Sequence, residues 1–253
     1  MSDKKQILDV QHIHMRFNSK GVCVRAVTDV SFTVDEGETI GIVGESGCGK
    51  TTLGRCIVRA YEPSEGDVMY TAADGETVNF TKIDKKTMKK YRKEIQMIFQ
   101  DPYSSLDPRM TVYDIIKEPL AANYPKMPKE EMDRRIMDIA AKVGLNTSYL
   151  MRYPHAFSGG QRQRIGIARA LVLNPRVIVC DESVSALDVS IQAQVINLLH
   201  DLQKELDLTY LFISHDLSVV EYISDKVAVM YLGRMVEYAP TKALFGHPLH
   251  PYT

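Results

Sequence analysis

The sequence predicts an α/β protein with a mixed-sheet core, an antiparallel β subdomain and an inserted helical subdomain. Short, continuous apolar runs such as "TIGIVG", "RVIVCDE" and "TYLFIS" are typical of parallel strands buried on both faces. Alternating runs near the N-terminus indicate the β subdomain, and a proline-rich middle with one amphipathic helix indicates the helical subdomain. We expect one domain over residues 1–253, with the core and β subdomain at about 1–100 and 158–253 and the helical subdomain at about 101–157.

The bulk composition excludes several classes of protein. The 253 residues carry a net charge of −1, so no basic field predicts nucleic-acid binding. The start, "MSDKKQILDVQ", lacks the apolar segment of a signal peptide, and no run approaches the roughly 18 to 20 apolar residues of a spanning helix. We therefore expect a cytosolic chain whose membrane role, if it has one, comes through a partner. Its four cysteines have no CxxC spacing and are expected to be reduced thiols.

The first hundred residues predict strands around one helix. The runs "ILDVQHIHMRF" and "VCVRAVTDVSFTV" alternate, the turn "DEGE" follows, and "TIGIVG" is a buried strand. A helix is expected to begin at Lys50. The segments "GDVMYT" and "ETVNF" flank the turn "AADG" and predict a hairpin, and "IQMIF" predicts another core strand.

The middle of the chain changes character. The segment "MPKEEMDRRIMDIAAKVG" predicts a helix that ends at Gly144. Its apolar face consists of Met132, Ile136, Ile139, Ala140 and Val143. Prolines are expected to break the surrounding segment into short pieces, and they stand at positions 102, 108, 119, 125 and 128. The core then resumes with "RVIVCDE", a helix near 189–204, "TYLFIS" and the strand pair "KVAVMYLG" and "RMVEYA".

A glycine-rich loop between the predicted strand and helix indicates a nucleotide site. The segment "GESGCGKT", residues 44–51, matches G-x-x-x-x-G-K-[ST], in which small residues let backbone amides approach phosphate oxygens. The following helix adds its positive N-terminal end. Lys50 is expected to reach the β- and γ-phosphates of ATP, and the Thr51 hydroxyl to ligate Mg²⁺. The expected nucleotide contacts are Gly44, Glu45, Ser46, Gly47, Cys48, Gly49, Lys50, Thr51 and Thr52.

Four polar residues follow predicted core strands and are the candidate catalytic set. Asp181 ends "VIVCD" and is expected to hold Mg²⁺ through water, and Glu182 to polarise an attacking water. Gln100 ends "IQMIFQ" and is expected to contact Mg²⁺ or that water. His215 follows "TYLFIS" and is expected to hydrogen-bond the γ-phosphate.

These motifs, in this order, resemble the nucleotide-binding subunit of an ATP-binding cassette (ABC) transporter over nearly the whole chain. The resemblance makes Phe17 the aromatic residue that stacks on adenine and "FSGGQ", residues 157–161, the family signature. It makes "SALD", residues 185–188, the D-loop, so Asp188 joins the nucleotide contacts, and it makes His215 the switch histidine. The signature usually begins with Leu, and Phe157 stands there instead.

The signature explains why the chain carries a second set of small residues. Ser158 is able to cap the helix that follows, and Gly159 and Gly160 leave its first amides open, which makes an anion cradle together with Gln161. The resemblance implies two subunits packed head to tail, in which each signature clamps the ATP held by the other subunit. It leaves open whether the partner is identical or related.

A narrower resemblance identifies the transport class. "FQDPYSSLDPRMTV" after Gln100 and "HPLHPYT" at the end are similar to ATPase subunits of oligopeptide and dipeptide importers, a family that includes nickel and metallophore importers. It implies ATP-driven import through transmembrane permease subunits, with an extracellular substrate-binding protein, at the cytoplasmic face of the membrane. Residues 100–109 are expected to face the permease. In that family "HPYT" introduces a further segment, so we expect a shortened chain or a short member.

Three alternatives remain. Nickel or metallophore import is the nearest. A soluble cassette ATPase of DNA repair or translation would carry two cassettes, a long coiled coil or a zinc module, and none is visible in the sequence. A regulator without turnover conflicts with the presence of Glu182 and His215.

Overall fold

A computed structural model describes residues 5–19, 21–101, 103–185 and 187–253. Its strands are β1 (Gln6–Ser19), β2 (Val22–Asp35), β3 (Thr39–Val43), β4 (Glu65–Thr71), β5 (Thr77–Asn79), β6 (Ile95–Ile98), β7 (Val177–Asp181), β8 (Thr209–Ile213), β9 (Lys226–Tyr231) and β10 (Arg234–Pro240). Its helices are α1 (Lys50–Ile57), α2 (Lys85–Tyr91), α3 (Val112–Asn123), α4 (Lys129–Lys142), α5 (Gly159–Leu171), α6 (Val189–Leu206), α7 (Leu217–Ile223) and α8 (Thr241–Gly246), with short 3₁₀ helices at Thr147–Tyr149 and Pro154–Ala156.

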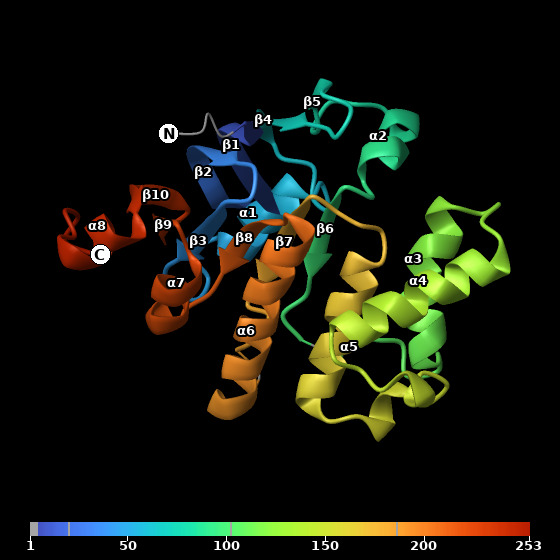
Figure 1. Cartoon of the computed structure of the whole chain (residues 1–253). Coiled ribbons are helices and arrows are strands. Elements are labelled where there is room, and N and C mark those ends of the chain that lie inside the picture. The colour runs from blue at the N-terminus through green and yellow to red at the C-terminus, as the bar shows by residue number, and fades with distance from the viewer. Residues whose placement is uncertain (1–4, 20, 102, 186) are drawn as a thin grey trace.

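A six-stranded sheet with the order β10-β9-β3-β8-β7-β6 forms the core (Figure 1). Its strands pair in parallel except for β10, which is antiparallel to β9, so the mixed sheet is confirmed. Every residue of β3, β7 and β8 is buried, as the continuous apolar runs predict. Among the described residues, no helix is both long enough and apolar enough to cross a membrane.

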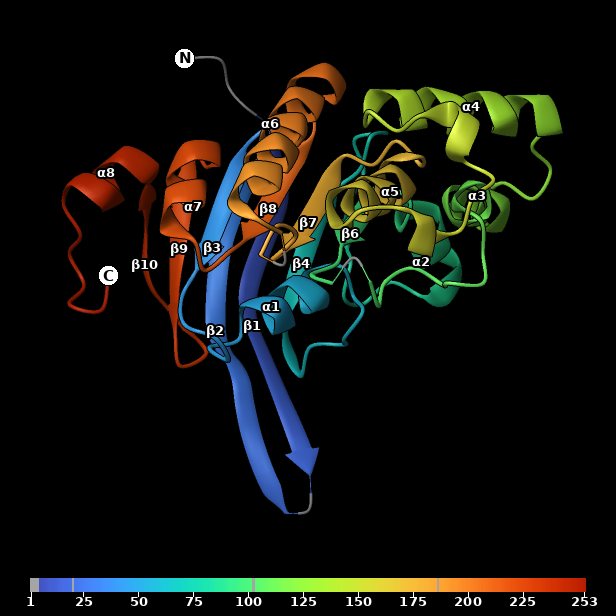
Figure 2. The ribbon, with the colours of Figure 1, turned by 90° about the horizontal axis from the view of Figure 1, so that it is seen from below.

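The N-terminal strands form a second, antiparallel sheet with the order β2-β1-β4-β5. Figure 2 shows β1 and β2 as a long ribbon that projects from the body of the molecule. The predicted hairpin of β4 and β5 is confirmed, with Thr71 opposite Thr77. Exposed and buried residues alternate along the second half of β2, because only one face of this sheet packs on the core.

The six-stranded sheet separates two hydrophobic cores. Ile178 and Cys180 of β7 face a core shared with the helices α3 to α7. Val177 and Val179 face the other way, into a core shared with α1 and the antiparallel sheet. Because successive side chains of a strand point to opposite faces, one short strand joins both cores and fixes them relative to each other.

The predicted amphipathic helix is confirmed as α4. Met132, Ile136, Ile139 and Ala140 are buried, and Gly144 follows with a left-handed φ of 72°. Figures 1 and 2 show α3 and α4 beyond β6, on the side of the sheet opposite β10 and α8. The boundaries of the helical subdomain stay a prediction, since α5 packs against both β6 and α3.

Helices α2, α3, α7 and α8 differ from the sequence expectations, and α3 and α2 show why. The expectation that prolines break the middle into short pieces is wrong at Pro119, which lies inside the 12-residue helix α3. This helix buries Val112, Ile115, Ile116 and Leu120, and that apolar stripe outweighs the lost backbone hydrogen bond. Helix α2 was not predicted, because only Met88 and Tyr91 of its seven residues are buried and the apolar pattern is too sparse.

Replacing Pro119 by alanine is expected to stabilise the protein. Alanine restores an N–H that donates within α3 and removes a ring that crowds the preceding turn, a gain of about 1–3 kcal/mol in the free energy of unfolding. Urea unfolding followed by circular dichroism measures it, with Pro125→Ala as control, because Pro125 lies in the turn after the helix. An unchanged or lower stability of Pro119→Ala alone would show that the helix has already accommodated the proline.

Candidate functional site

The glycine-rich loop joins β3 to α1, where the sequence predicts it. Gly44, Gly47 and Gly49 have φ values of 147°, 80° and 105°, which side chains rarely adopt. A Cβ on Gly44 would lie 2.2 Å from the Met230 carbonyl oxygen, and a Cβ on Gly49 2.2 Å from the Ala26 carbonyl oxygen. The loop therefore passes so close to neighbouring backbone that only glycine fits at these two positions.

Lys50 lies inside this loop and is 3% exposed. Its Nζ donates hydrogen bonds to the carbonyl oxygens of Gly44, at 2.7 Å, and Glu45, at 2.8 Å. Within the described ranges, no side chain caps the N-terminus of α1 at Gly49. A buried cation and uncapped helix amides thus lie at one point, which is an arrangement that favours an anion such as a phosphate.

Asp181 and Thr51 meet at the end of β7. Thr51 Oγ1 donates to Asp181 Oδ1 at 2.7 Å, and Asp181 Oδ2 is buried with no hydrogen-bond partner in the described part of the chain. Burial raises the pKa of Asp181, and the bond from Thr51 opposes that shift. A buried carboxylate oxygen without a partner beside a hydroxyl fits a divalent cation with a preference for oxygen ligands, so both residues suit Mg²⁺.

Glu182 is the point at which the other candidates converge. Its Oε2 accepts a hydrogen bond from Gln100 Nε2 at 2.9 Å and lies 3.4 Å from His215 Nδ1. The side chain is 14% exposed, and the backbone has a left-handed φ of 43°. Such a conformation costs energy for a residue other than glycine and persists where surrounding bonds impose it. Here the Glu182 amide donates to the Ile213 carbonyl of the adjacent strand at 3.0 Å.

The two glycines of "FSGGQ" differ in how closely neighbouring side chains approach them. Ser158 caps α5, accepting from the Gln161 amide at 3.4 Å, while the Gln161 side chain accepts from the Ser158 amide at 3.0 Å, so the predicted cap is confirmed. A Cβ on Gly160 would lie 2.4 Å from Ile191 Cγ2 of α6, whereas the described atom nearest to a Cβ on Gly159, the Tyr103 hydroxyl oxygen, is 3.4 Å away. Gly160 is therefore required for helix packing, and Gly159 is not.

Phe17 and Asp188 have positions that neither require nor exclude a nucleotide. Phe17 is 38% exposed and contacts Tyr61 edge-on, with ring centroids 5.6 Å apart. Asp188 caps α6 by accepting from the Ile191 amide at 3.0 Å. Their nucleotide contacts, and that of the half-buried Thr52, stay predictions. Ala186 of the D-loop lies outside the described residues.

The loop after Gln100 is tied to itself and to α5. Arg109 Nη2 donates to Asp107 Oδ2 at 2.9 Å, and the guanidinium lowers the pKa of Asp107 to about 2. Arg169 of α5 donates to the Ser105 carbonyl oxygen at 2.5 Å. Pro102 in this loop lies outside the described residues, and the predicted contact with a permease stays a prediction.

Sequence reasoning missed one residue near the phosphate loop. Tyr252 belongs to the segment "HPLHPYT", which the sequence singles out only as a family resemblance. The structure places its hydroxyl 2.9 Å from the Glu45 amide nitrogen. No pattern in the sequence indicates this contact, because the two residues lie 207 positions apart. All four cysteines are free thiols, and Cys48 lies buried in the phosphate loop.

Comparisons with known proteins agree with this geometry. The profile of the ABC transporter family matches residues 27–185. The chain is 53% identical to the oligopeptide transport ATP-binding protein OppF of Bacillus subtilis, covering 98% of this chain and 80% of that protein. It is 47% identical to the dipeptide transport ATP-binding protein DppF of Lactococcus lactis, covering 100% of this chain and 80% of that protein.

Solved structures show the same fold. One match is MJ0796, a dimeric ATP-binding cassette in a post-hydrolysis state bound to ADP and Pi. It superimposes with a TM-score of 0.81 at 26% identity, and the match covers 93% of this chain and 99% of that chain. The cbiO1 protein of Clostridium perfringens, part of the ABC transporter complex cbiONQ, gives the same TM-score at 28% identity, covering 96% of this chain and 92% of that chain.

Proposed function

This chain belongs to the ABC transporter family, and we propose that it is the ATP-hydrolysing subunit of a membrane importer for oligopeptides or dipeptides. The observation that carries the proposal is the identity of about half of all residues, along nearly the whole chain, with ATP-binding proteins named for oligopeptide and dipeptide transport. The runs "FQDPYSSLDPRMTV" and "HPLHPYT" support the same class.

The residues around the phosphate loop bind ATP. The loop amides and Lys50 supply donors and positive charge for the phosphates. Thr51 and Asp181 are the residues that would hold Mg²⁺, which when bound neutralises charge on the phosphates. Because Lys50 and Asp181 are almost fully buried, their charges act where water screens them little.

Glu182 acts as the general base for hydrolysis. Its carboxylate is held by Gln100 on one side and His215 on the other, so one oxygen has a fixed position at the edge of the sheet. A positioned carboxylate accepts the proton of the attacking water. Gln100 and His215 therefore position the base in addition to the contacts predicted for them, which are Mg²⁺ or the attacking water for Gln100 and the γ-phosphate for His215.

The working unit is a pair of cassettes packed head to tail, each completing the other's ATP site through Ser158, Gly159 and Gly160. The dimeric cassette structures support the pairing of two cassettes, and they leave open whether the partner subunit is identical or related. Gly159 supports it from within this chain, because the nearest described atoms to a Cβ there, Tyr103 Oη at 3.4 Å and Leu187 Cδ2 at 3.6 Å, are at ordinary contact distance and packing does not require glycine.

Transport requires further chains. We place the cassette on the cytoplasmic face of the membrane, bound to permease subunits through residues 100–109, with an extracellular binding protein delivering peptide. The exposed Arg109, whose side chain is 87% accessible, is available for such a contact. ATP closes the pair of cassettes, and hydrolysis reopens it, which couples the ATP cycle to the permease.

Co-purification tests the function directly. The tagged chain is isolated from detergent-extracted membranes of its own cells, reconstituted with the permease it brings, and assayed for ATP-dependent uptake of a labelled tripeptide. We expect peptide uptake that Lys50→Ala abolishes. Uptake of nickel without peptide would establish the metal importer instead, and stimulation of the ATPase by nucleic acid without a permease would establish a soluble cassette.

Glu182→Gln is expected to hold ATP without turning it over. The amide still accepts the bond from Gln100 but takes no proton from water, so the hydrolysis rate falls by about 10² to 10⁴. Phosphate release measures the rate, and light scattering after size exclusion should show a dimer with ATP and not with ADP. Glu221→Gln, at an exposed glutamate of α7, is the control. Hydrolysis at the normal rate would exclude Glu182 as the base, and a mutant that stays monomeric is mixed with the co-purified partner subunit.

Gly159→Asp is expected to stop hydrolysis and leave ATP binding by the separate chain unchanged. A Cβ at this position would meet described atoms only at ordinary contact distances of 3.4 Å or more, so the fold should tolerate the side chain, while its charge would repel a γ-phosphate presented by a partner. The control is Gly166→Asp, the same change at an open position in the interior of α5. A parallel loss of binding and turnover would show that the signature acts within its own subunit.

A further inference from the structure

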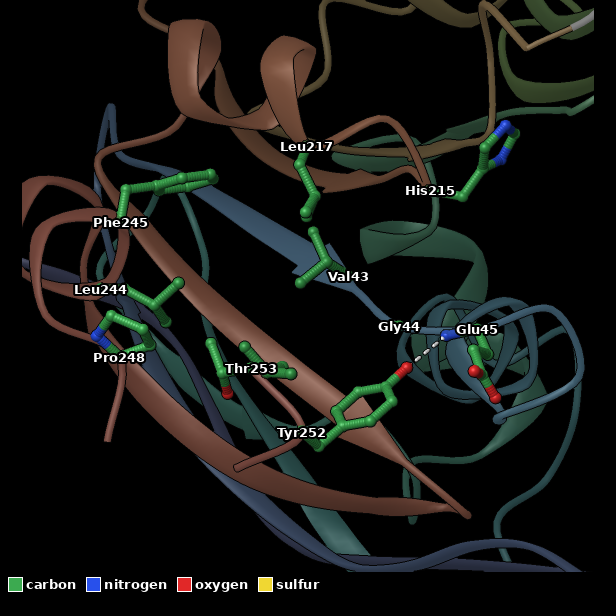
Figure 3. Close-up of a pocket in the computed structure, with 11 residues that line it drawn as sticks. Val43, Gly44, Glu45, His215, Leu217, Leu244, Phe245, Pro248, Tyr252 and Thr253 are labelled. Atoms are coloured by element: carbon green, nitrogen blue, oxygen red, sulfur yellow. Dashed lines mark hydrogen bonds between the residues drawn. The ribbon is translucent and has the colours of Figure 1, made fainter. Parts of the chain in front are cut away.

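The C-terminal segment of the chain reaches the phosphate loop from outside. Figure 3 shows the Tyr252 side chain directed at Glu45, whose backbone N–H donates a hydrogen bond to the Tyr252 hydroxyl oxygen at 2.9 Å. We propose that Tyr252 is a positioning residue that holds the phosphate loop in its ATP-binding conformation. The proposal rests on ATP binding at this loop and not on the identity of the transported ligand.

Tyr252 is itself held in place by several contacts. Its ring packs on the ring of Tyr231, with centroids 4.4 Å apart. The Glu237 carboxylate of β10 accepts hydrogen bonds from the backbone amides of Leu249, at 2.9 Å, and His250, at 3.1 Å. The Tyr252 amide in turn donates to His250 Nδ1 at 3.2 Å. The hydroxyl is thus presented to the loop by a segment that is anchored on the sheet.

The loop is held at Glu45 from two sides. The Glu45 carbonyl oxygen accepts hydrogen bonds from Lys50 Nζ at 2.8 Å and from the Cys48 amide at 3.2 Å, both within the loop. The Glu45 amide bonds outward, to Tyr252. Loss of the bond to Tyr252 would therefore free the backbone of Glu45, and the Glu45 carbonyl oxygen is one of the two that orient the Lys50 ammonium.

Packing supports this corner of the loop poorly. Glu45, Ser46 and Gly47 are exposed, and a Cβ on Gly47 would meet no atom of the described chain within 4 Å. Beside Gly44 and Glu45 lies a cavity of about 440 Å³. Leu217, Leu244 and Phe245 line its other side (Figure 3). Across this cavity no side chain of the described residues packs directly on the loop, so the bond from Tyr252 matters more here than at a packed position.

The expected effect is on ATP affinity. Without the tyrosine oxygen the loop samples other conformations, and apparent affinity falls in proportion to the binding-competent fraction. Loss of one neutral hydrogen bond corresponds to a decrease of about 2- to 10-fold. The turnover number should change by less than about 2-fold, because Gln100, Glu182 and His215 follow other strands and, among the described residues, form no hydrogen bond with Tyr252.

Tyr252→Phe is the test, because it keeps the ring against Tyr231 and removes only the hydroxyl. Three quantities are measured on the full chain: the Kd for a fluorescent ATP analogue, KM and kcat for ATP, and hydrogen exchange of the peptide containing the Glu45 amide. We expect a higher Kd and KM, nearly constant kcat and faster exchange at Glu45. Tyr238→Phe is the matched control, since its hydroxyl donates to the Thr33 carbonyl oxygen at 3.0 Å, within the sheets. It should leave Kd and KM unchanged.

Several results would overturn the assignment. Unchanged Kd and exchange in Tyr252→Phe would do so, as would a lowered melting temperature with normal ATP affinity. An effect in Tyr252→Ala but not in Tyr252→Phe would transfer the role to the ring. Lys50→Ala separates this inference from the proposed function. If the unaltered chain bound ATP no better than Lys50→Ala, the ATP site itself would be wrong, whereas normal binding in Tyr252→Phe alone would remove only the role of Tyr252.

Discussion

Parallel pairing of β3, β8, β7 and β6 is the constraint on which the site depends. Parallel strands end at the same edge of a sheet, so residues that follow them are brought together however far apart they lie in the chain. The register is specific: Ile98 pairs with Cys180, and Asp181 pairs with Ile213. A slip by one residue would turn Asp181 to the opposite face of the sheet and place Cys180 or Glu182 where its carboxylate stands. The buried side chains on both faces of β7 oppose such a slip, and in this way the two cores protect the geometry of the site.

The sheet and the phosphate loop were predictable because their sequence patterns have local causes. A strand buried on both faces must be apolar throughout. A loop residue whose Cβ would lie 2.2 Å from a carbonyl oxygen must be glycine. Helix α3 was not predictable in the same way. Its proline opposes a helix locally, and the helix exists because Ile116 and Leu120 find a tertiary core that the sequence does not display.

The site was predictable as a set of residues but not as a set of bonds. Strand ends identified Gln100, Glu182 and His215. Nothing in the sequence indicates that Gln100 and His215 both lie against one carboxylate oxygen of Glu182, or that Glu182 has a left-handed backbone. The two signature glycines look alike in sequence, and only the contact with Ile191 distinguishes the one that packing requires. These features depend on distances between segments far apart in the chain, and a single sequence records none of them.

Buried charge links ligand binding to stability at the same edge of the sheet. Asp181 is inaccessible to solvent, and burial raises its pKa above the ordinary value of 3.8. The native state therefore binds this proton more tightly than the unfolded chain does. The contribution of Asp181 to stability is greatest below the ordinary pKa and decreases as the pH rises through the raised value. The ionised carboxylate thus lowers stability relative to the protonated one, and Oδ2, which has no partner in the described residues, accounts for part of that cost. A divalent cation beside Oδ2 would remove the cost, and any ligand that binds only the folded state raises the free energy of unfolding. The atom best suited to hold the cation is therefore also the atom through which binding would stabilise the fold.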